Sequence, residues 1–287
     1  MANILVTGAN GQLGSEIRRC GFCSLDDVFY TGSEELDIRD SDAVRSFICE
    51  NEIDTIINCA AYTVVDKAEK EPAKAESVNV KGVKNLAKVA AEEDCLLIHI
   101  STDYIFDGNS DRPYMETDVP HPLNVYGHTK LQAEEEILKS DCLYIIIRTS
   151  WLYSAYGNNF VKTILRLMSE GKSLTVVDDQ FGSPTYAGDL ADAILMIFNN
   201  SDLLDNEGIY NFCNSGYCSW YELATAIAEE CGYEGEIKAV PTSDYPTVAL
   251  RPPYSVLNTD KIKKHFGIEA PNWRDALKRC IKEINKK

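Results

Sequence analysis

The segment VTGANGQLG, close to the start of the chain, constrains the fold more than any other feature of the sequence. It places Gly8, Gly11 and Gly14 at every third position, after an apolar stretch at 2–7 and before an amphipathic one at 12–20. A tight turn from strand to helix needs a residue that tolerates positive φ, and a backbone without Cβ atoms can approach a diphosphate closely. A third small residue lets the helix pack against its strand. The segment therefore predicts a strand, a diphosphate-binding turn and a helix.

The stretches that follow alternate between strand-like and helix-like patterns. Continuous apolar runs at 54–62, 96–102 and 143–151 are typical of strands that are buried on both faces. Residues 36–40, LDIRD, predict a further short strand, and a helical pattern at 41–51 follows it. Strands joined by helices of crossover length form a parallel sheet with helices on both faces. The expected fold class is therefore α/β, with a doubly wound parallel sheet.

The alternation changes after residue 151, and this change predicts two domains. We expect residues 1–150 to form a dinucleotide-binding domain and residues 151–287 to contribute mainly a smaller, C-terminal substrate-binding lobe. A helix and a strand predicted at about 186–216 are expected to return to the main sheet, so that the lobe is discontinuous in sequence.

The charge of the chain excludes several classes of partner. Its 287 residues carry a formal net charge of −17. Such a protein does not attract the phosphates of nucleic acids or of anionic membranes, so neither is an expected partner. No apolar run reaches the roughly 18 residues that span a bilayer, and the N-terminus lacks the features of a signal peptide, which predicts a cytoplasmic location. The four histidines show no metal-ligand spacing, and no metal is expected.

The glycine turn predicts a dinucleotide, and the sequence after the second predicted strand bears on which one. At the end of that strand, predicted at 28–32, and just beyond it, residues 31–35 read TGSEE, without an Arg or Lys that could bind a 2′-phosphate. The two carboxylates at this place would repel such a phosphate. A nicotinamide coenzyme is expected on these grounds, with NADH preferred and NADPH left open.

The segment NVYGHTK places Tyr126 and Lys130 four residues apart, on one face of a predicted helix. Thr102 ends the predicted strand 96–102, at the edge where sheets of this kind bind ligands. A neighbouring ammonium would lower the pKa of the tyrosine from about 10 and make its phenol a better general acid or base. The Thr102 hydroxyl could donate a hydrogen bond to a substrate carbonyl oxygen. These three residues are the expected catalytic group.

Six blocks, in order and over nearly the whole chain, carry a resemblance to a known family: AAYTVVDKAE, STDYIFDG, NVYGHTK, RTSWLY, DDQFGSPTYAGDLA and RPPYSVLNTDKI. With the glycine turn, they resemble the extended short-chain dehydrogenase/reductase family, and within it the branch that reduces dTDP-4-dehydrorhamnose. The resemblance implies a Rossmann-like domain with a smaller lobe for a nucleotide sugar. It also implies an NAD(P)H-dependent oxidoreductase that reduces the 4-keto group of dTDP-4-dehydro-L-rhamnose to give dTDP-L-rhamnose.

The resemblance also implies roles for individual residues. Tyr126 would give the proton, Lys130 would hold the nicotinamide ribose and Thr102 would hold the carbonyl oxygen. The coenzyme would be bound by residues of the glycine turn and of the neighbouring strand ends, namely Gly8, Gly11, Gln12, Leu13, Gly14, Asp37, Ile38, Ala61, Tyr62 and Thr63, with Tyr126 and Lys130. The sugar would contact residues on the other side of the cleft, namely Thr102, Asp103, Tyr104 and Trp151.

Some positions leave alternatives open. Arg251, which precedes two prolines, could bind the substrate diphosphate or pair with a surface acid. Trp151 could contact the sugar or belong to the core, and Asn159 is expected to cap a helix rather than to bind sugar. Position 62 is commonly His in this family and is Tyr here. Some members bind magnesium through glutamates at a dimer contact; Glu16 could correspond to one of these, but no convincing set is present.

Two other classes of function also stay open. A nucleotide-sugar epimerase or dehydratase would use the same scaffold, although dehydratases usually carry an Asp-Glu pair where this chain has Asp103 and Tyr104. A regulatory subunit resembling that of methionine adenosyltransferase would be a binding module, which the intact set of Thr102, Tyr126 and Lys130 disfavours. A nucleotide-sugar substrate is the expected partner, and a homodimer is left open.

Overall fold

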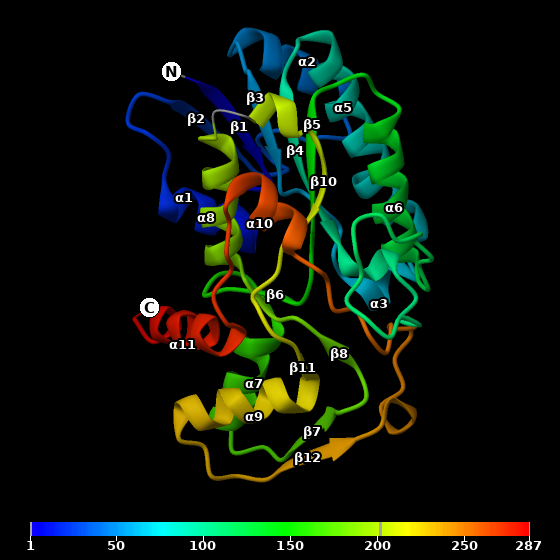
Figure 1. Cartoon of the computed structure of the whole chain (residues 1–287), viewed down its shortest axis with the longest axis vertical. Coiled ribbons are helices and arrows are strands. Elements are labelled where there is room, and N and C mark those ends of the chain that lie inside the picture. The colour runs from blue at the N-terminus through cyan, green and yellow to red at the C-terminus, as the bar shows by residue number, and fades with distance from the viewer. Residues whose placement is uncertain (1, 201–202, 287) are drawn as a thin grey trace.

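The computed structural model describes residues 2–200 and 203–286 of the chain (Figure 1). Its largest element is a six-stranded parallel sheet with the strand order β10-β5-β4-β3-β1-β2. The strands are β1 (Asn3–Thr7), β2 (Asp27–Thr31), β3 (Thr55–Asn58), β4 (Leu96–Thr102), β5 (Tyr144–Thr149) and β10 (Gly208–Asn211). The chain moves outward from β1 to β2 and then returns to β3 on the other side of β1. The carboxyl ends of β1 and β3 therefore form the switch point at which such sheets bind ligands.

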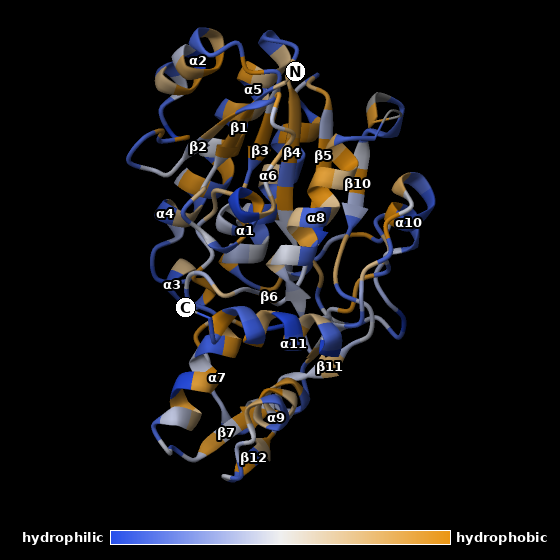
Figure 2. Ribbon diagram, turned by 90° about the vertical axis from the view of Figure 1, so that its left-hand side faces the viewer, coloured by the Kyte–Doolittle hydropathy of each residue, from blue (hydrophilic) through white to orange (hydrophobic). Residues whose placement is uncertain are grey.

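Helices cover both faces of this sheet. One face packs against α1 (Gln12–Cys20), α8 (Ala187–Phe198) and α10 (Asp260–Phe266). The other face packs against α2 (Ser41–Glu50), α5 (Val83–Glu92) and α6 (Val125–Leu138). Figure 2 shows the apolar strands of the sheet lying between these helices. The expected fold class, an α/β fold with a Rossmann-like doubly wound parallel sheet, is confirmed.

Strand β1 shows why the strands of this sheet read as continuous apolar runs. Its residues Ile4, Leu5 and Val6 are all fully buried. Successive side chains of a strand point to opposite faces, so Ile4 and Val6 join the core under α1 and α8 while Leu5 joins the core under α2 and α5. A strand covered by helices on both faces has no polar face, and its sequence therefore does not alternate.

The short strand predicted at 36–40 is wrong, because these residues form a loop that leads into α2. The apolar side chains of Leu36 and Ile38 are buried from this loop, in the same core as α2 and α5. Ile38 packs so closely on Gly82 that a Cβ atom there would lie 2.7 Å from it. Asp40 then caps α2 by accepting hydrogen bonds from the backbone N–H groups of Asp42 and Ala43. Burial of alternate residues in a loop thus imitates the pattern of a strand.

The connection from β3 to β4 is helical for most of its length. It contains α3 (Val65–Ala68), α4 (Pro72–Glu76), a π-helical turn (Ser77–Gly82) and α5. Pro72 stands in the first turn of α4, where its missing N–H leaves no hydrogen bond unmade. A π-helical turn widens the helix by one residue and often lies near a functional site. Here it carries the buried side chain of Asn79.

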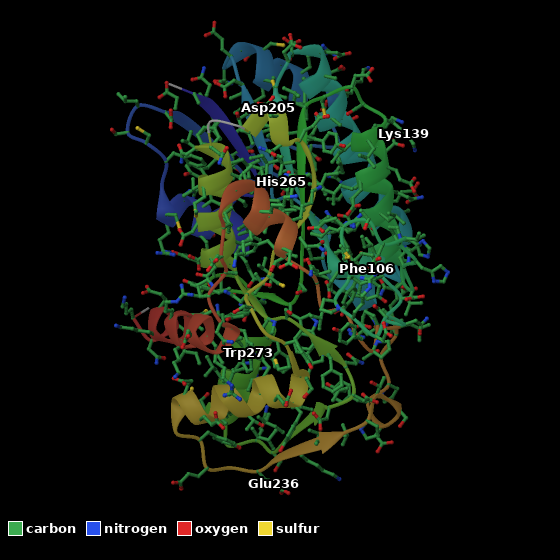
Figure 3. All side chains as sticks on the ribbon, viewed as in Figure 1. Phe106, Lys139, Asp205, Glu236, His265 and Trp273 are labelled. Atoms are coloured by element: carbon green, nitrogen blue, oxygen red, sulfur yellow. The ribbon has the colours of Figure 1, made fainter. Side chains whose placement is uncertain are left out.

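A second core lies below the sheet in Figure 1 and forms the smaller lobe. Its helices are α7 (Phe160–Ser169), α9 (Trp220–Cys231) and α11 (Trp273–Ile284). Three pairs of short strands complete it: β6 (Leu152–Tyr153) with β9 (Thr185–Tyr186), β7 (Leu174–Val177) with β12 (Ile237–Val240), and β8 (Phe181–Gly182) with β11 (Cys218–Ser219). Trp273, labelled in Figure 3, begins α11 and is buried in this core.

The segment between the lobe elements crosses back to the sheet. Helix α8 packs on α1, and β10 pairs in parallel with β5 at the edge of the sheet. Short 3-10 helices at Asp103–Ile105, Leu203–Asn206 and Thr242–Asp244 lie in the connections. Within residues 2–200 and 203–286, no helix is both long and apolar enough to cross a membrane.

Candidate active site

The glycine turn after β1 has the geometry that its sequence predicts. Gly8 adopts a φ of +63°, and a Cβ atom on it would lie 2.5 Å from the backbone nitrogen of Ala60. A Cβ atom on Gly14 would lie 2.5 Å from the Cα atom of Ala9, so this position needs glycine for the packing of α1. Gly11 is different, because a Cβ atom on it would meet a single atom within 4 Å, the Gly8 carbonyl oxygen at 3.2 Å. Gly11 is exposed and precedes the first residue of α1, where a backbone without a side chain fits a diphosphate.

A groove runs along the carboxyl edge of the sheet on both sides of this turn. One half of it, with a volume of about 490 Å³, extends from the glycine turn to the lobe. The other half, with a volume of about 440 Å³, extends from the turn toward the loop before α2. The two halves meet at residues that line both, namely Gly8, Gly11, Cys59 and Ala61. A groove of this length and continuity can take an extended dinucleotide across the switch point.

The half of the groove before α2 holds the predicted adenine residues and two cations that the sequence argument overlooked. Asp37 and Ile38 line it, together with Arg39 and Lys74. Arg39 forms a two-pronged ion pair with Asp37, with a shortest N–O distance of 2.6 Å, and this contact lowers the pKa of the Asp37 carboxyl. Glu35 accepts a hydrogen bond from the Gly32 N–H at 2.8 Å. Cations are therefore present at this end, on the loop before α2 and on α4.

The strand end AAYT is fixed from behind by Asn79 of the π-helical turn. The Asn79 side chain accepts a hydrogen bond from the Tyr62 N–H at 2.7 Å and donates one to the Tyr62 carbonyl at 3.1 Å. It also donates to the Thr129 hydroxyl on α6 at 3.0 Å. This clamp holds Ala61, Tyr62 and Thr63 along the groove, where the resemblance implies coenzyme contacts. The Tyr62 hydroxyl itself points to Glu71, at 3.1 Å.

The three expected catalytic side chains line one cleft. Thr102, Tyr126 and Lys130 all face the half of the groove that extends to the lobe. Helix α6 begins at Val125, after Asn124 caps it by accepting a hydrogen bond from the Gly127 N–H, so Tyr126 and Lys130 lie in its first two turns. The spacing of four residues therefore places Tyr126 and Lys130 on one face of α6, as predicted.

The electrostatics of Tyr126 differ from the expectation. Burial raises its pKa to about 12, and a hydrogen bond with Thr102 only partly opposes this effect. Lys130 does not act on the phenol in this structure, because its Nζ atom lies 3.0 Å from His99 Nε2 and 2.6 Å from the Ile100 carbonyl oxygen. Burial also lowers the pKa of Lys130 to about 8. The predicted lowering of the tyrosine pKa by a neighbouring ammonium is thus wrong for this arrangement of the side chains.

Asp103 and Tyr104 follow Thr102 into the same cleft. The Thr102 hydroxyl donates to Asp103 Oδ1 at 3.1 Å and accepts from the Tyr104 N–H at 3.2 Å. Asp103 is buried, and this burial raises the pKa of its carboxyl to about 7 although hydroxyl groups of Ser255 and Thr102 act in the opposite direction. The carboxyl therefore keeps its proton in about half of the molecules at neutral pH.

The lobe supplies an aromatic wall to the cleft. The rings of Trp151 and Trp220 stack in parallel, with centroids 3.5 Å apart. Trp151 has a φ of +46°, which is unusual for a large side chain, and its ring lies where a Cβ atom on Gly182 would be. Both rings line the cleft, so Trp151 is at the same time packed on the lobe and exposed to a ligand. Sequence reasoning missed Trp220, since nothing local to it indicates a partner 69 positions away.

Asn159 joins the lobe to the glycine turn. As predicted, it caps α7 by accepting a hydrogen bond from the Lys162 N–H. Its amide also donates to the Gln12 side-chain oxygen at 2.8 Å, on the first residue of α1. This contact between the two halves of the molecule lies at the cleft and was not expected from the sequence.

Two predicted site residues lie outside the lining of the groove. Gly14 faces Ala9 and serves the packing of α1. Arg251 forms an ion pair with Asp66 of α3, with a shortest N–O distance of 2.6 Å. Its guanidinium also partly opposes the rise in the pKa of Tyr104 that burial causes. The structure thus shows the surface pairing that the sequence left as one of two alternatives. Within the described part of the chain, no group of three or more His, Cys, Asp and Glu side chains could hold a metal ion.

Comparisons with known proteins agree with this geometry. The model of the RmlD substrate binding domain family matches residues 1–286. A dTDP-4-dehydrorhamnose reductase of Aggregatibacter actinomycetemcomitans is 43% identical over 97% of this chain and 98% of its own. The crystal structure of a dTDP-4-dehydrorhamnose reductase from Clostridium acetobutylicum superposes with a TM-score of 0.94 at 38% identity, over 99% of both chains. That of a Bacillus anthracis dTDP-4-dehydrorhamnose reductase in complex with NADP has a TM-score of 0.92 at 36% identity, over 99% of this chain and 100% of its own.

The family match extends from the glycine turn to the last helix of the lobe, and it therefore covers both walls of the cleft. The similarity to these two solved structures covers the same elements. Its sequence identity, 38% and 36%, indicates common descent and not a shared fold alone. This chain belongs to the RmlD substrate binding domain family.

Proposed function

We propose that this chain reduces the 4-keto group of dTDP-4-dehydro-L-rhamnose to give dTDP-L-rhamnose, with NADH or NADPH as reductant. The observation that carries the proposal is the placement of Thr102, Tyr126 and Lys130 in one cleft with the bare backbone at Gly11. Relatives that are about 40% identical over nearly their full length and are named for this activity support it.

In the proposed reaction, the coenzyme supplies a hydride to C4 of the sugar when it is bound with its diphosphate at the glycine turn. Thr102 donates a hydrogen bond to the keto oxygen and so stabilises the negative charge that develops there. Tyr126 then gives its phenolic proton to that oxygen. Its raised pKa keeps the phenol protonated at neutral pH, and the alkoxide that forms is a stronger base than the phenolate that is left, so the transfer is favourable.

The two walls of the cleft divide the remaining roles. We assign the coenzyme to the groove along the sheet edge, with Asp37 and Ile38 at its adenine and Lys130 at its nicotinamide ribose. We assign the nucleotide sugar to the lobe of residues 151–287, without the returning segment 186–216, where Trp151 and Trp220 offer a flat apolar surface. Asp103 and Tyr104 would contact the sugar from the sheet side.

Within this proposal NADH is preferred to NADPH. The Asp37 carboxylate lines the adenine half of the groove and neutralises Arg39, which leaves that cation committed to an internal ion pair. A 2′-phosphate would have to compete with Asp37 for Arg39. Initial rates with NADH and NADPH at matched concentrations test this preference, and a higher kcat/KM for NADPH would contradict it.

The experiment for the activity follows the loss of NADH absorbance with freshly prepared dTDP-4-dehydro-L-rhamnose. One NADH should be consumed for each keto sugar. Tyr126→Phe should lower kcat by roughly 10²- to 10⁴-fold, because it removes the proton donor, while the dissociation constant of NADH changes little. Near-normal turnover in this variant would contradict the role of Tyr126.

The rival functions give different outcomes in the same assay. An epimerase or dehydratase regenerates its coenzyme and would convert the sugar without net loss of NADH. A non-catalytic regulatory subunit would show no turnover on any keto sugar and would instead capture a catalytic partner. The homodimer that the sequence leaves open is tested by light scattering of the purified chain.

A further inference from the structure

A row of four buried polar side chains crosses the sheet directly beneath the candidate site. Thr7 ends β1, Asn58 ends β3, His99 lies in β4 and Lys130 projects from α6. Each is at most 1% exposed. The Thr7 hydroxyl donates to Asn58 Oδ1 at 2.7 Å, Asn58 Nδ2 lies 2.9 Å from His99 Nδ1, and His99 Nε2 lies 3.0 Å from Lys130 Nζ. Of the four, only Lys130 lines the cleft.

The direction of this hydrogen-bond chain is set at Asn58. Its Oδ1 atom accepts a hydrogen bond from the backbone N–H of Ala60 at 3.1 Å, in addition to the one from Thr7. A backbone N–H can only donate, so the atom that faces it must be the amide oxygen. The amide nitrogen of Asn58 therefore faces His99 Nδ1 and donates to it. A neutral imidazole carries one N–H and one acceptor nitrogen, and Nδ1 is thus the acceptor.

The proton of His99 then lies on Nε2, which faces Lys130. An ammonium group has three N–H donors and no acceptor, so a charged Lys130 would set donor against donor across 3.0 Å. A neutral amine has one lone pair and two N–H donors. It can accept from His99 Nε2–H and still donate to the Ile100 carbonyl oxygen at 2.6 Å. The geometry is therefore fully satisfied only with an uncharged Lys130.

Three titratable groups face Lys130, and burial of the amine outweighs those among them that favour its charged form. His99 faces it from β4, Cys59 from the end of β3 and Glu134 from its own helix. Glu134 is already committed to Arg148 of β5, in an ion pair of 2.7 Å. Burial lowers the pKa of Lys130 to about 8, although Glu134 and Cys59 act to raise it, and the pKa of His99 lies well below its usual range.

We propose that His99 is a positioning residue for Lys130: it donates its Nε2–H to the lysine amine, and so favours the uncharged form of that amine and keeps it turned toward β4 when the cleft is empty. The inference rests on the proposed function, in which Lys130 binds the nicotinamide ribose of the coenzyme. At a pH above its pKa in the empty cleft, Lys130 takes one proton from the solvent when it leaves His99 and turns to the ribose oxygens. Binding of the anionic coenzyme is thus coupled to the uptake of a proton.

This coupling has a defined sign. Below the pKa of Lys130 in the empty cleft the proton is already present, so affinity for the coenzyme does not depend on it. Above that pKa the amine must first be protonated, and the affinity falls about tenfold for each further pH unit. The dissociation constant of NADH, followed by quenching of tryptophan fluorescence, should therefore rise as the pH increases beyond about 8.

The first test needs neither a variant nor activity. Long-range ¹H–¹⁵N NMR spectra of the unliganded protein distinguish the two neutral tautomers of a histidine and its charged form. His99 should give the pattern of the Nε2–H tautomer, without titration between pH 6 and 9. An Nδ1–H tautomer or an imidazolium at this position would overturn the proposal.

The second test reverses the hydrogen-bond chain with a near-isosteric change. In Asn58→Asp the carboxylate can only accept, so His99 must place its proton on Nδ1 and offer the Nε2 lone pair to Lys130. An ammonium is then favoured, and the pH at which NADH affinity begins to fall should rise by about one unit or more. Thr7→Val is the matched control. It removes the outer hydrogen bond to Asn58 but leaves the contact from Ala60, and neither the tautomer nor the pH profile should change.

Two results of this test would refute the inference. Asn58→Asp could keep the Nε2–H tautomer, in which case the chain does not set the state of His99. Alternatively, the tautomer could switch while the pH profile of NADH binding stays unchanged, in which case His99 does not control Lys130. Failure of the proposed reductase activity looks different, because the tautomer of His99 and the binding of NADH are both measured without the sugar.

Discussion

The cleft has a sheet wall, formed by the carboxyl edge of the sheet and α6, and a lobe wall, formed by Trp151 and Trp220. The two walls hold their side chains by different forces. On the sheet side, close backbone approach at Gly8 and hydrogen bonds from buried polar groups fix the glycine turn, the strand end at Tyr62 and the amine of Lys130. On the lobe side, the contact surface is the stack of Trp151 on Trp220, which is held by packing. Hydrogen bonds have a fixed direction, whereas an apolar stack can slide at little cost. We infer that the sheet wall places the reacting groups and that the lobe wall adapts to the shape of the ligand.

Each wall also contains one residue in an unfavourable state. Asp103 is a buried carboxyl whose pKa is raised to about 7. Trp151 adopts a backbone conformation that large side chains avoid, with a φ of +46°. The first is an electrostatic strain and the second is a conformational strain. Strain of either kind persists only where the surrounding structure holds it in place, and such residues concentrate at functional sites.

The largest effect is expected from Gly8→Ala on the sheet wall. The new Cβ atom would meet the backbone of Ala60 and the residue would keep a positive φ, so we expect a loss of about 3 kcal/mol or more in the free energy of unfolding. Gly171→Ala, after α7 in the lobe, is the matched control. Gly171 has a φ of +65° but no atom within 4 Å of the new Cβ, and the loss should be about 1 kcal/mol. Urea denaturation measures both, and equal losses would contradict the close approach at Gly8.

The next effect is a pH dependence that originates at Asp103. Its pKa is raised in the folded protein from 3.8 to about 7. Between these values the unfolded chain loses the proton while the folded chain keeps it, so the free energy of unfolding falls as the pH rises from about 4 to 7. Asp103→Asn should remove this contribution, which is on the order of 4 kcal/mol. Denaturation curves at pH 4 and pH 8 measure the difference, and parallel pH profiles of the variant and the parent would show that Asp103 is not its source.

A smaller effect is expected from Trp220→Ala on the lobe wall. The variant loses the stack on Trp151, and we expect a loss of about 2 kcal/mol in the free energy of unfolding. KM for the sugar should rise while the dissociation constant of NADH stays within about twofold, because the coenzyme groove is formed by the sheet side. Tyr217→Ala, an exposed lobe tyrosine, is the control and should change stability by less than about 0.5 kcal/mol. A larger effect of Trp220→Ala on NADH than on the sugar would contradict the division between the walls.

The smallest effect concerns Asn159, where the two walls meet. Asn159→Asp keeps an acceptor for the N-cap of α7 but removes the donor to Gln12, whereas Asn159→Ala removes both. The alanine variant should lose about 1 kcal/mol of stability through the cap and the aspartate variant less than half of that. Both should show a similar rise in KM for the sugar, since both lose the link between lobe and turn. Steady-state kinetics and thermal unfolding separate the two roles.

Much of the sheet side could be predicted from sequence because its signals are local. The glycine spacing, the apolar runs and the spacing of Tyr126 and Lys130 each depend on residues within one or two elements. The strand predicted at 36–40 failed because burial from a loop produced the same pattern as a strand. Arg39 was overlooked for a related reason, since it lies beyond the segment where a phosphate ligand was sought and reaches the adenine end only through the loop geometry.

The lobe side and the protonation states could not be predicted in this way. Trp220 meets Trp151, and Asn159 meets Gln12, across long separations in sequence. The expected effect of Lys130 on Tyr126 was wrong because the lysine has a closer partner, His99, on another element. Nothing in the sequence near Lys130 or near His99 indicates the contact between these two residues.

The sequence alone determined most of the course of the backbone on the sheet side. It did so because the glycine turn, the fully apolar strands and the one-turn spacing on α6 depend on steric limits and hydrophobic periodicity that act between near neighbours. Only the tertiary structure decided which groups carry charge and which rings meet. The pKa of Lys130 depends on burial and on a hydrogen-bond chain with atoms from β1, β3, β4 and α6. A ring stack depends on the packing of the whole lobe. Neither effect can be predicted from a short stretch of the sequence.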